Sequence, residues 1–86
     1  MSDSDGAIRE WLLAFLAARD TSGPPPTDDE DLFTSGRLDS LGVVAMITAL
    51  EQRFGVRFSE DDLEDARFAR VSGVVEIVRE ARARDA

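Results

Sequence analysis

The chain of 86 residues lacks cysteine, histidine and tyrosine, and all ten of its basic residues are arginine. Without cysteine there can be no disulfide and no thiolate-bound metal. Without histidine or lysine the chain has neither the commonest general base nor an amine nucleophile, and it lacks the imidazole ligands that zinc usually takes. Serine chemistry remains possible, but the usual group that activates a serine is absent. The composition therefore argues against an enzyme that works alone.

Long hydrophobic runs are also missing. No apolar run approaches the ~20 residues that span a bilayer, so we expect no membrane segment and no membrane partner. The acidic N-terminus, residues 1–5, is unlike a signal peptide, and we expect a cytoplasmic protein. A chain of this length is enough for one small domain, which we place at residues 1–86, and we expect a monomer.

Acidic residues outnumber basic residues in this chain. Eighteen acidic residues stand against ten arginines, which gives a net charge of −8. This charge argues against a nucleic-acid partner. It favours encounter with basic protein surfaces, although it could equally serve only to keep a small protein in solution.

Apolar residues at helical spacing predict a first helix with Ser4 or Asp5 as its N-cap and an end at Asp20–Gly23. Its expected inner face consists of Ile8, Trp11, Leu12, Phe15 and Leu16.

A long irregular loop should follow, because Pro24–Asp31 holds three prolines and four acidic residues. Leu32, Phe33 and Leu38 interrupt the polar stretch. A free loop of this length is unusual in a compact domain, so we expect these three side chains to pin it against the bundle.

The second helix is predicted from Ser40 to Phe54, with Gly55 as its stop. Its expected inward residues are Val43, Val44, Ile47, Leu50 and Phe54. An extended connection should follow. A capping box at Ser59–Asp62 should then open a short helix that runs to about Asp65. The last helix is expected from about residue 71, with Val71, Val74, Val75 and Val78 inward and Arg79–Arg84 at its end. The predicted fold is an all-α bundle of three longer helices and one short helix.

One serine, Ser40, stands where the polar loop becomes an apolar helix, with Asp39 before it and Leu41 after it. A helix start offers free backbone N–H groups and the positive end of the helix dipole, so a phosphodiester on Ser40 would lie in a favourable field. The simpler interpretation is that Asp39 or Ser40 merely caps the helix.

The string Gly36–Val44 and its surroundings resemble the attachment site of the acyl carrier protein family, whose hallmark is Asp-Ser-Leu at the start of the second helix. The further segments that carry the resemblance are Leu32-Phe33, Leu50-Glu51, Phe54–Val56, Glu60–Leu63, Phe68 and the Val71/Val75/Val78 face. The resemblance implies that a phosphopantetheinyl transferase moves 4′-phosphopantetheine from coenzyme A onto Ser40. Acyl or aminoacyl cargo would then be held as a thioester on the arm, so the chain itself would catalyse nothing.

The resemblance also implies partner contacts on the second helix and the loop before it. The candidate contact residues are Leu41, Met46 and Glu51, although Leu41 and Met46 could equally be ordinary core. The implied partners are the transferase, a loading enzyme and a downstream synthase or transferase.

The charge pattern of the chain departs from that of fatty-acid-synthase carriers. The helix at 40–54 holds one acid and one arginine, whereas the negative charge lies at 28–31 and 60–65. The paired glycines of peptide-synthetase carriers are replaced by Arg37-Leu38-Asp39. The chain looks more like free-standing carriers that separate enzymes load.

Among such carriers, a specialised natural-product pathway is our first choice. The alternative is an aminoacyl, D-alanyl or glyceryl carrier. A helical interaction module that is never modified and a calcium-binding module built on the acidic runs are the remaining hypotheses, and the acidic runs lack the ligand pattern of an EF-hand.

Overall fold

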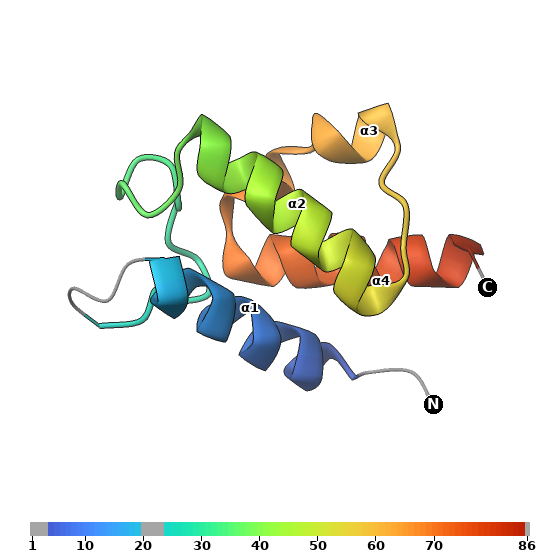
Figure 1. The fold of residues 1–86 in the computed structure, drawn as a ribbon, viewed down its shortest axis with the longest axis horizontal. Helices are drawn as coiled ribbons and strands as arrows, with labels where there is room; N and C mark the ends of the chain where they lie inside the picture. The colour runs from blue at the N-terminus through green and yellow to red at the C-terminus, as the bar shows by residue number, and fades with distance from the viewer. Residues whose placement is uncertain (1–3, 20–23, 86) are drawn as a thin grey trace.

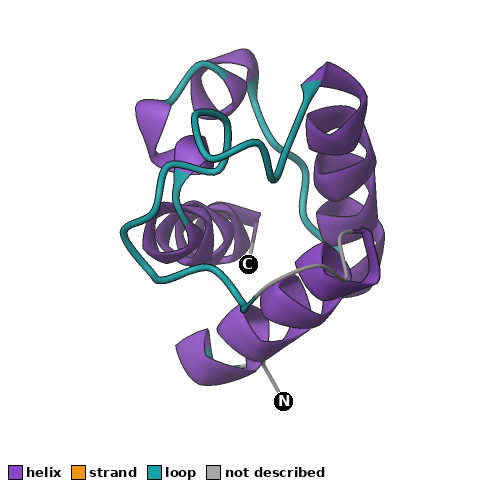
Figure 2. Ribbon diagram, turned by 90° about the vertical axis from the view of Figure 1, so that its left-hand side faces the viewer, coloured by secondary structure: helices purple, strands orange, loops and turns teal. Residues whose placement is uncertain are grey.

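The structure, a computed structural model, describes residues 4–19 and 24–85. It contains the helices α1 (Asp5–Arg19), α2 (Ser40–Phe54), α3 (Glu60–Leu63) and α4 (Val71–Asp85) and a 3-10 helix, η1 (Ala66–Ala69). Helices α1 and α4 pack side by side and α2 lies across α4 (Figure 1). The long connection passes the end of the bundle where α1 ends and α2 and α4 begin (Figure 2). The predicted all-α architecture is confirmed, whereas η1 was not predicted.

Local capping chemistry sets the ends of the longer helices. The Ser4 hydroxyl accepts a hydrogen bond from the Ala7 N–H at 3.2 Å, so Ser4 rather than Asp5 is the cap of α1. The predicted end of this helix at residues 20–23 lies outside the described residues. Gly55 ends α2 as predicted: its φ is +67° and its N–H donates to the Glu51 carbonyl at 3.0 Å.

The capping box at the start of α3 is also confirmed. The Ser59 hydroxyl accepts from the Asp62 N–H at 3.1 Å, and the Asp62 carboxylate accepts from the Ser59 N–H at 2.9 Å. Helix α3 ends at Leu63 rather than near Asp65. The reason is that the Asp65 carboxylate accepts from the Arg67 N–H at 2.9 Å and so caps η1 instead.

The 3-10 helix lies against the first turn of α4. A Cβ added to Gly73 would lie 2.2 Å from the Arg67 carbonyl oxygen, so only glycine permits this approach. The Arg67 guanidinium then forms ion pairs with Asp65 at 2.9 Å, Glu76 at 3.3 Å and Glu80 at 2.8 Å. Its hydrogen bonds lower the pKa of the Asp65 and Glu80 carboxyls. Arg67 thereby joins η1 to the middle of α4.

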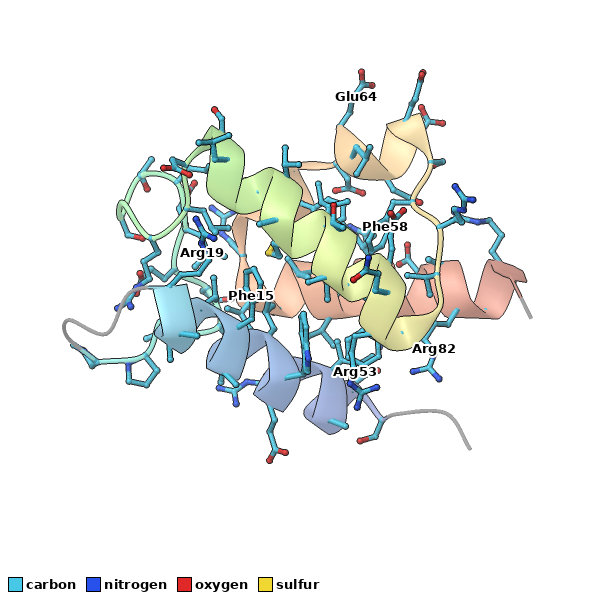
Figure 3. All side chains as sticks on the ribbon, viewed as in Figure 1. Phe15, Arg19, Arg53, Phe58, Glu64 and Arg82 are labelled. Atoms are coloured by element: carbon cyan, nitrogen blue, oxygen red, sulfur yellow. The ribbon has the colours of Figure 1, made fainter. Side chains whose placement is uncertain are left out.

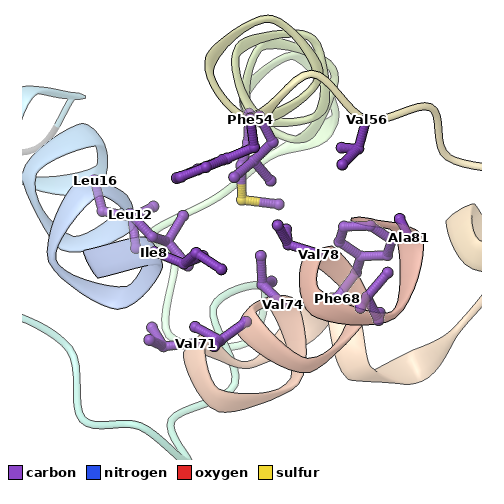
Figure 4. Packing of buried hydrophobic residues seen from close by; sticks show 14 of the residues in the cluster. Ile8, Leu12, Leu16, Phe54, Val56, Phe68, Val71, Val74, Val78 and Ala81 are labelled. Carbon is purple, nitrogen blue, oxygen red and sulfur yellow. The ribbon is translucent and has the colours of Figure 1, made fainter. Parts of the chain in front are cut away.

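A single cluster of buried hydrophobic residues fills the space between the helices (Figure 4). It contains the predicted inner residues of α4 and three of those predicted for α1, while Trp11 and Phe15 pack against it partly exposed. Its members are Ile8, Leu12, Leu16, Leu32, Leu38, Met46, Leu50, Phe54, Val56, Phe68, Val71, Val74, Val75, Ile77, Val78 and Ala81.

The rotational phase of α2 differs from the prediction at one residue. Val44 was expected in the core, but it is 61% exposed. The buried positions are Gly42, Met46, Leu50 and Phe54, which recur every four residues along one face. Val44 lies two residues from two members of this row and therefore points away from the core.

The long loop is pinned by two of the three predicted side chains. Leu32 and Leu38 are buried, whereas Phe33 is 44% exposed, so the prediction that Phe33 also pins the loop was wrong. The Leu32 N–H donates to the Ala69 carbonyl at 2.7 Å, which ties the loop to η1. The turn after Leu32 is closed by polar groups, so Phe33 is free to point outward.

Candidate functional site

Ser40 lies beside the residue that caps α2 and is not the cap itself. Ser40 is the first residue of α2 and is exposed. The Asp39 carboxylate accepts from the Gly42 N–H at 2.7 Å, and its carbonyl accepts from the Val43 N–H at 2.9 Å. Asp39 is therefore the N-cap. The side chain of Ser40, the other candidate cap, is not needed for this role.

The first turn of α2 sits closely on the residues beneath it. Gly42 is buried, and a Cβ there would lie 3.2 Å from the Asp39 Oδ1, 3.2 Å from the Leu38 Cδ2 and 3.3 Å from the Arg19 Nη2. Arg19 ends α1 and its guanidinium stands 6.0 Å from the centre of the Phe15 ring. Figure 3 shows it between the end of α1 and the start of α2. The guanidinium adds positive charge beside the positive end of the helix dipole.

The turn that leads to Ser40 is closed by hydrogen bonds to Asp31. Its Oδ1 accepts from the Phe33 N–H at 2.9 Å and from the Thr34 N–H at 3.0 Å. The Thr34 bond and then the Phe33 bond hold the pKa of the Asp31 carboxyl below its ordinary value. Gly36 has a φ of +81°, a conformation that favours glycine, and its N–H donates to the Phe33 carbonyl at 3.1 Å. The Leu38 N–H then donates to the carbonyl of Leu32, which stands before the turn, at 2.9 Å.

The three candidate contact residues lie in different environments. Leu41 is 79% exposed beside Ser40, so its side chain is available to a partner. Met46 is fully buried, so of its two alternatives, contact residue or ordinary core, the structure supports the core. Glu51 is half-buried and its carboxylate accepts from the Phe58 N–H at 3.0 Å, which ties the connection after α2 back to the helix.

Three other large apolar side chains are exposed in the described residues. These are Val44 on α2, Phe33 in the preceding turn and Leu63 on α3, the last 45% exposed. Val44 was expected in the core from its helical spacing, and Phe33 was expected to pin the loop against the bundle. A second apolar row, Met46, Leu50 and Phe54 at four-residue spacing, is also present in the sequence, but on a helix that is apolar on all sides spacing alone does not choose between the rows.

The arrangement fits an anionic group on Ser40. The hydroxyl is exposed, the first amides of α2 are directed beyond the helix end, and Arg19 lies close beneath. Within the described ranges, no helix is long and apolar enough to cross a bilayer. In the same ranges, no group of three His, Cys, Asp or Glu side chains could hold a metal ion, the acidic runs 28–31 and 60–65 included.

Comparison with known proteins gives one family and several relatives. The family described as "Phosphopantetheine attachment site" matches residues 10–80. The D-alanyl carrier protein of Streptococcus suis (strain 05ZYH33) is 48% identical over 75 residues, which cover 83% of this chain and 95% of the relative. The D-alanyl carrier proteins of Streptococcus sanguinis (strain SK36) and Streptococcus gordonii (strain Challis) are each 46% identical over 54 residues, or 57% of this chain and 67% of the relative.

Proposed function

The chain belongs to the phosphopantetheine-attachment family of carrier proteins, which are not catalytic, and from this premise we propose that Ser40 bears the arm. The observation that carries this proposal is the exposed position of Ser40 at the start of α2, where Asp39 already provides the cap. The arm, when bound, supplies a terminal thiol that holds cargo as a thioester. The residues of this chain present the serine, and Arg19 together with the helix dipole favours the phosphodiester charge.

We further propose that the cargo is a D-alanyl group or another small aminoacyl group, loaded by a separate enzyme. The support is the 48% identity to a D-alanyl carrier protein over 95% of that relative. A specialised natural-product pathway was our first choice from the sequence, and the relatives favour the aminoacyl alternative instead. The nearly neutral α2 agrees with a carrier outside fatty-acid synthesis. We keep the cytoplasm as the proposed location, because it supplies coenzyme A.

The proposed partners are a phosphopantetheinyl transferase, a loading ligase and an enzyme that removes the cargo. We propose that they meet the exposed apolar residues Leu41 and Val44 on α2 beside Ser40. Exposed apolar side chains that lie together are typical of protein contact sites. The role of Glu51 in docking stays a prediction, beside its hydrogen bond to the chain after α2.

Intact-protein mass spectrometry tests the attachment site. Wild type, Ser40→Ala and Ser35→Ala are incubated with coenzyme A and a broad-specificity phosphopantetheinyl transferase. Ser35 is the matched control, because it is an exposed serine in the turn before α2. We expect wild type and Ser35→Ala to gain one phosphopantetheine and Ser40→Ala to gain none. A phosphopantetheine on Ser40→Ala would refute Ser40 as the attachment site. So would the absence of phosphopantetheine from all three proteins, if they are folded.

The cargo is tested on the modified protein. A D-alanine-activating ligase and ATP are added with D-alanine, L-alanine or a medium-chain fatty acid, the last with an acyl ligase. We expect a mass gain of one alanyl group with D-alanine that hydroxylamine removes, since hydroxylamine cleaves thioesters. Efficient loading with the fatty acid and none with D-alanine would overturn the cargo and leave the attachment site standing.

A further inference from the structure

One arginine side chain joins the two halves of the loop before Ser40. The Arg37 Nη2 donates to the Pro24 carbonyl at 2.6 Å, and its Nε donates to the Glu30 carboxylate at 2.8 Å. The Arg37 side chain is only 16% exposed, so these bonds are partly shielded from water. Arg37 thus joins the segment that enters Ser40 to residues 7 and 13 positions earlier in the chain.

The first half of this loop is fixed to the rest of the molecule. The Ser72 N–H and hydroxyl both donate to the Asp28 carbonyl, at 3.2 and 3.1 Å, and the Arg70 Nε donates to the Asp29 carbonyl at 3.2 Å. These bonds hold the loop on the start of α4. Arg37 binds Glu30, which follows Asp29 in the chain. Through this contact the second half of the loop is held to the fixed first half.

The second half of the loop carries the exposed residues of the candidate site. Phe33 precedes Arg37 by four residues and Ser40 follows it by three. The Leu38 N–H donates to the Leu32 carbonyl at 2.9 Å, directly beside Arg37. With the arginine in place, Phe33 and Ser40 project from a turn whose base is closed on both sides.

We propose that Arg37 is a positioning residue for the loading of Ser40: it closes the loop and so holds Phe33 and Ser40 in one preformed surface for the transferase. The inference rests on the proposed function of Ser40. A loop that is already ordered loses less conformational freedom when a partner binds, so the KM for this carrier stays low. The planar fork of arginine serves a carbonyl and a carboxylate at once, which a lysine ammonium does less well.

Steady-state kinetics of the transferase reaction at saturating coenzyme A tests the proposal. For Arg37→Gln we expect the KM for the carrier to rise by about five- to tenfold, with kcat within about twofold, because ordering of the loop moves to the binding step. Arg37→Lys should fall between this variant and wild type. The matched control is Arg9→Gln, which breaks the exposed 2.7 Å ion pair to Asp28 in the same loop and should leave KM within about twofold.

Amide hydrogen exchange at Leu38 separates positioning from mere stability. We expect faster exchange of this amide in Arg37→Gln, together with the rise in KM, in a protein whose other core amides stay protected. If Arg37→Gln does not fold, Glu30→Gln removes the ionic part of the same contact and should raise KM by a smaller factor. An unchanged KM in the folded variant, with or without faster exchange at Leu38, would overturn the proposal.

Modification of wild type distinguishes the role of Arg37 from the role of Ser40. If wild type is never modified, the proposed function fails and the positioning role fails with it. If wild type is modified on Ser40 and a folded Arg37 variant is loaded with wild-type KM, only the positioning role is lost.

Discussion

Truncation of Met46 and truncation of Val44, which lie on the two faces of α2, should have very different effects on the free energy of unfolding. The two positions are two residues apart on an apolar helix, yet Met46 is fully buried and Val44 is 61% exposed. Met46→Ala removes core packing and leaves a cavity, which costs about 3 kcal/mol within the usual range of about 2–5 kcal/mol. Val44→Ala removes no core contact, and alanine favours the helix, so stability should change by less than about 0.5 kcal/mol.

Such a difference is large for a chain of this size. A domain of this length has a free energy of unfolding of roughly 4–13 kcal/mol, so Met46→Ala removes a sizeable share of it. At about 4–8 °C per kcal/mol, the melting temperature should fall by roughly 12–24 °C for Met46→Ala and by a few degrees at most for Val44→Ala.

Urea denaturation followed by tryptophan fluorescence measures the effect. Trp11 is the only tryptophan, and its ring packs on Phe15 and Phe54 at 5.6 Å between ring centres in each case. Its emission therefore reports whether α1 and α2 are packed together. If Val44→Ala destabilised the protein as much as Met46→Ala, the phase of α2 described here would be wrong. In the loading reaction Val44→Ala should have the larger effect. It alters the outer face of α2, which the folded Met46→Ala protein keeps.

Three further predictions follow from the caps and contacts. Asp39→Ala should lower the free energy of unfolding by about 0.5–2 kcal/mol in urea, and Ser40→Ala by clearly less, because Asp39 is the cap; equal losses would contradict this. Gly73→Ala should cost about 1–3 kcal/mol or prevent folding, since its methyl group would meet the Arg67 carbonyl; a wild-type melting temperature would refute the close approach. Hydrogen bonds from Arg67 put the folded pKa of Glu80 below its ordinary value of 4.5, so their stabilisation is present above pH 4.5 and is lost as the pH falls through the lower folded pKa. Arg67→Gln should therefore flatten the acid limb of a stability–pH curve, and an unchanged limb would show that Glu80 does not contribute.

The two ends of α2, the start of α3 and the candidate attachment serine were predictable because their determinants are local. The Asp39 cap, the Gly55 stop and the Ser59–Asp62 box each depend on residues within four positions of one another. Such short-range chemistry is visible in a sequence. Ser40 could be singled out for the same reason, since it stands where a polar loop meets an apolar helix.

The features missing from the prediction depend on contacts across turns or between separate segments. The 3-10 helix η1 forms where Gly73 lets α4 approach the Arg67 carbonyl, six residues away in the chain and across a turn. The role of Arg37 depends on the Pro24 carbonyl, 13 residues earlier, and a backbone carbonyl leaves no mark in a sequence. Arg19 lies beneath α2 only because α1 ends there.

The error at Val44 has a different origin, and it bears on function. The segment Gly42–Leu50 contains a single polar side chain, Thr48, so no polar stripe marks its outer face and periodicity alone cannot fix its phase. A helix that is apolar on all sides is either buried on all sides or covered by something else part of the time. Here Met46 and Leu50 account for the buried face, while Leu41 and Val44 stay exposed beside Ser40. Under the proposed function this ambiguity of the sequence is expected, since α2 would pack on its own core and still offer an apolar face to successive partners.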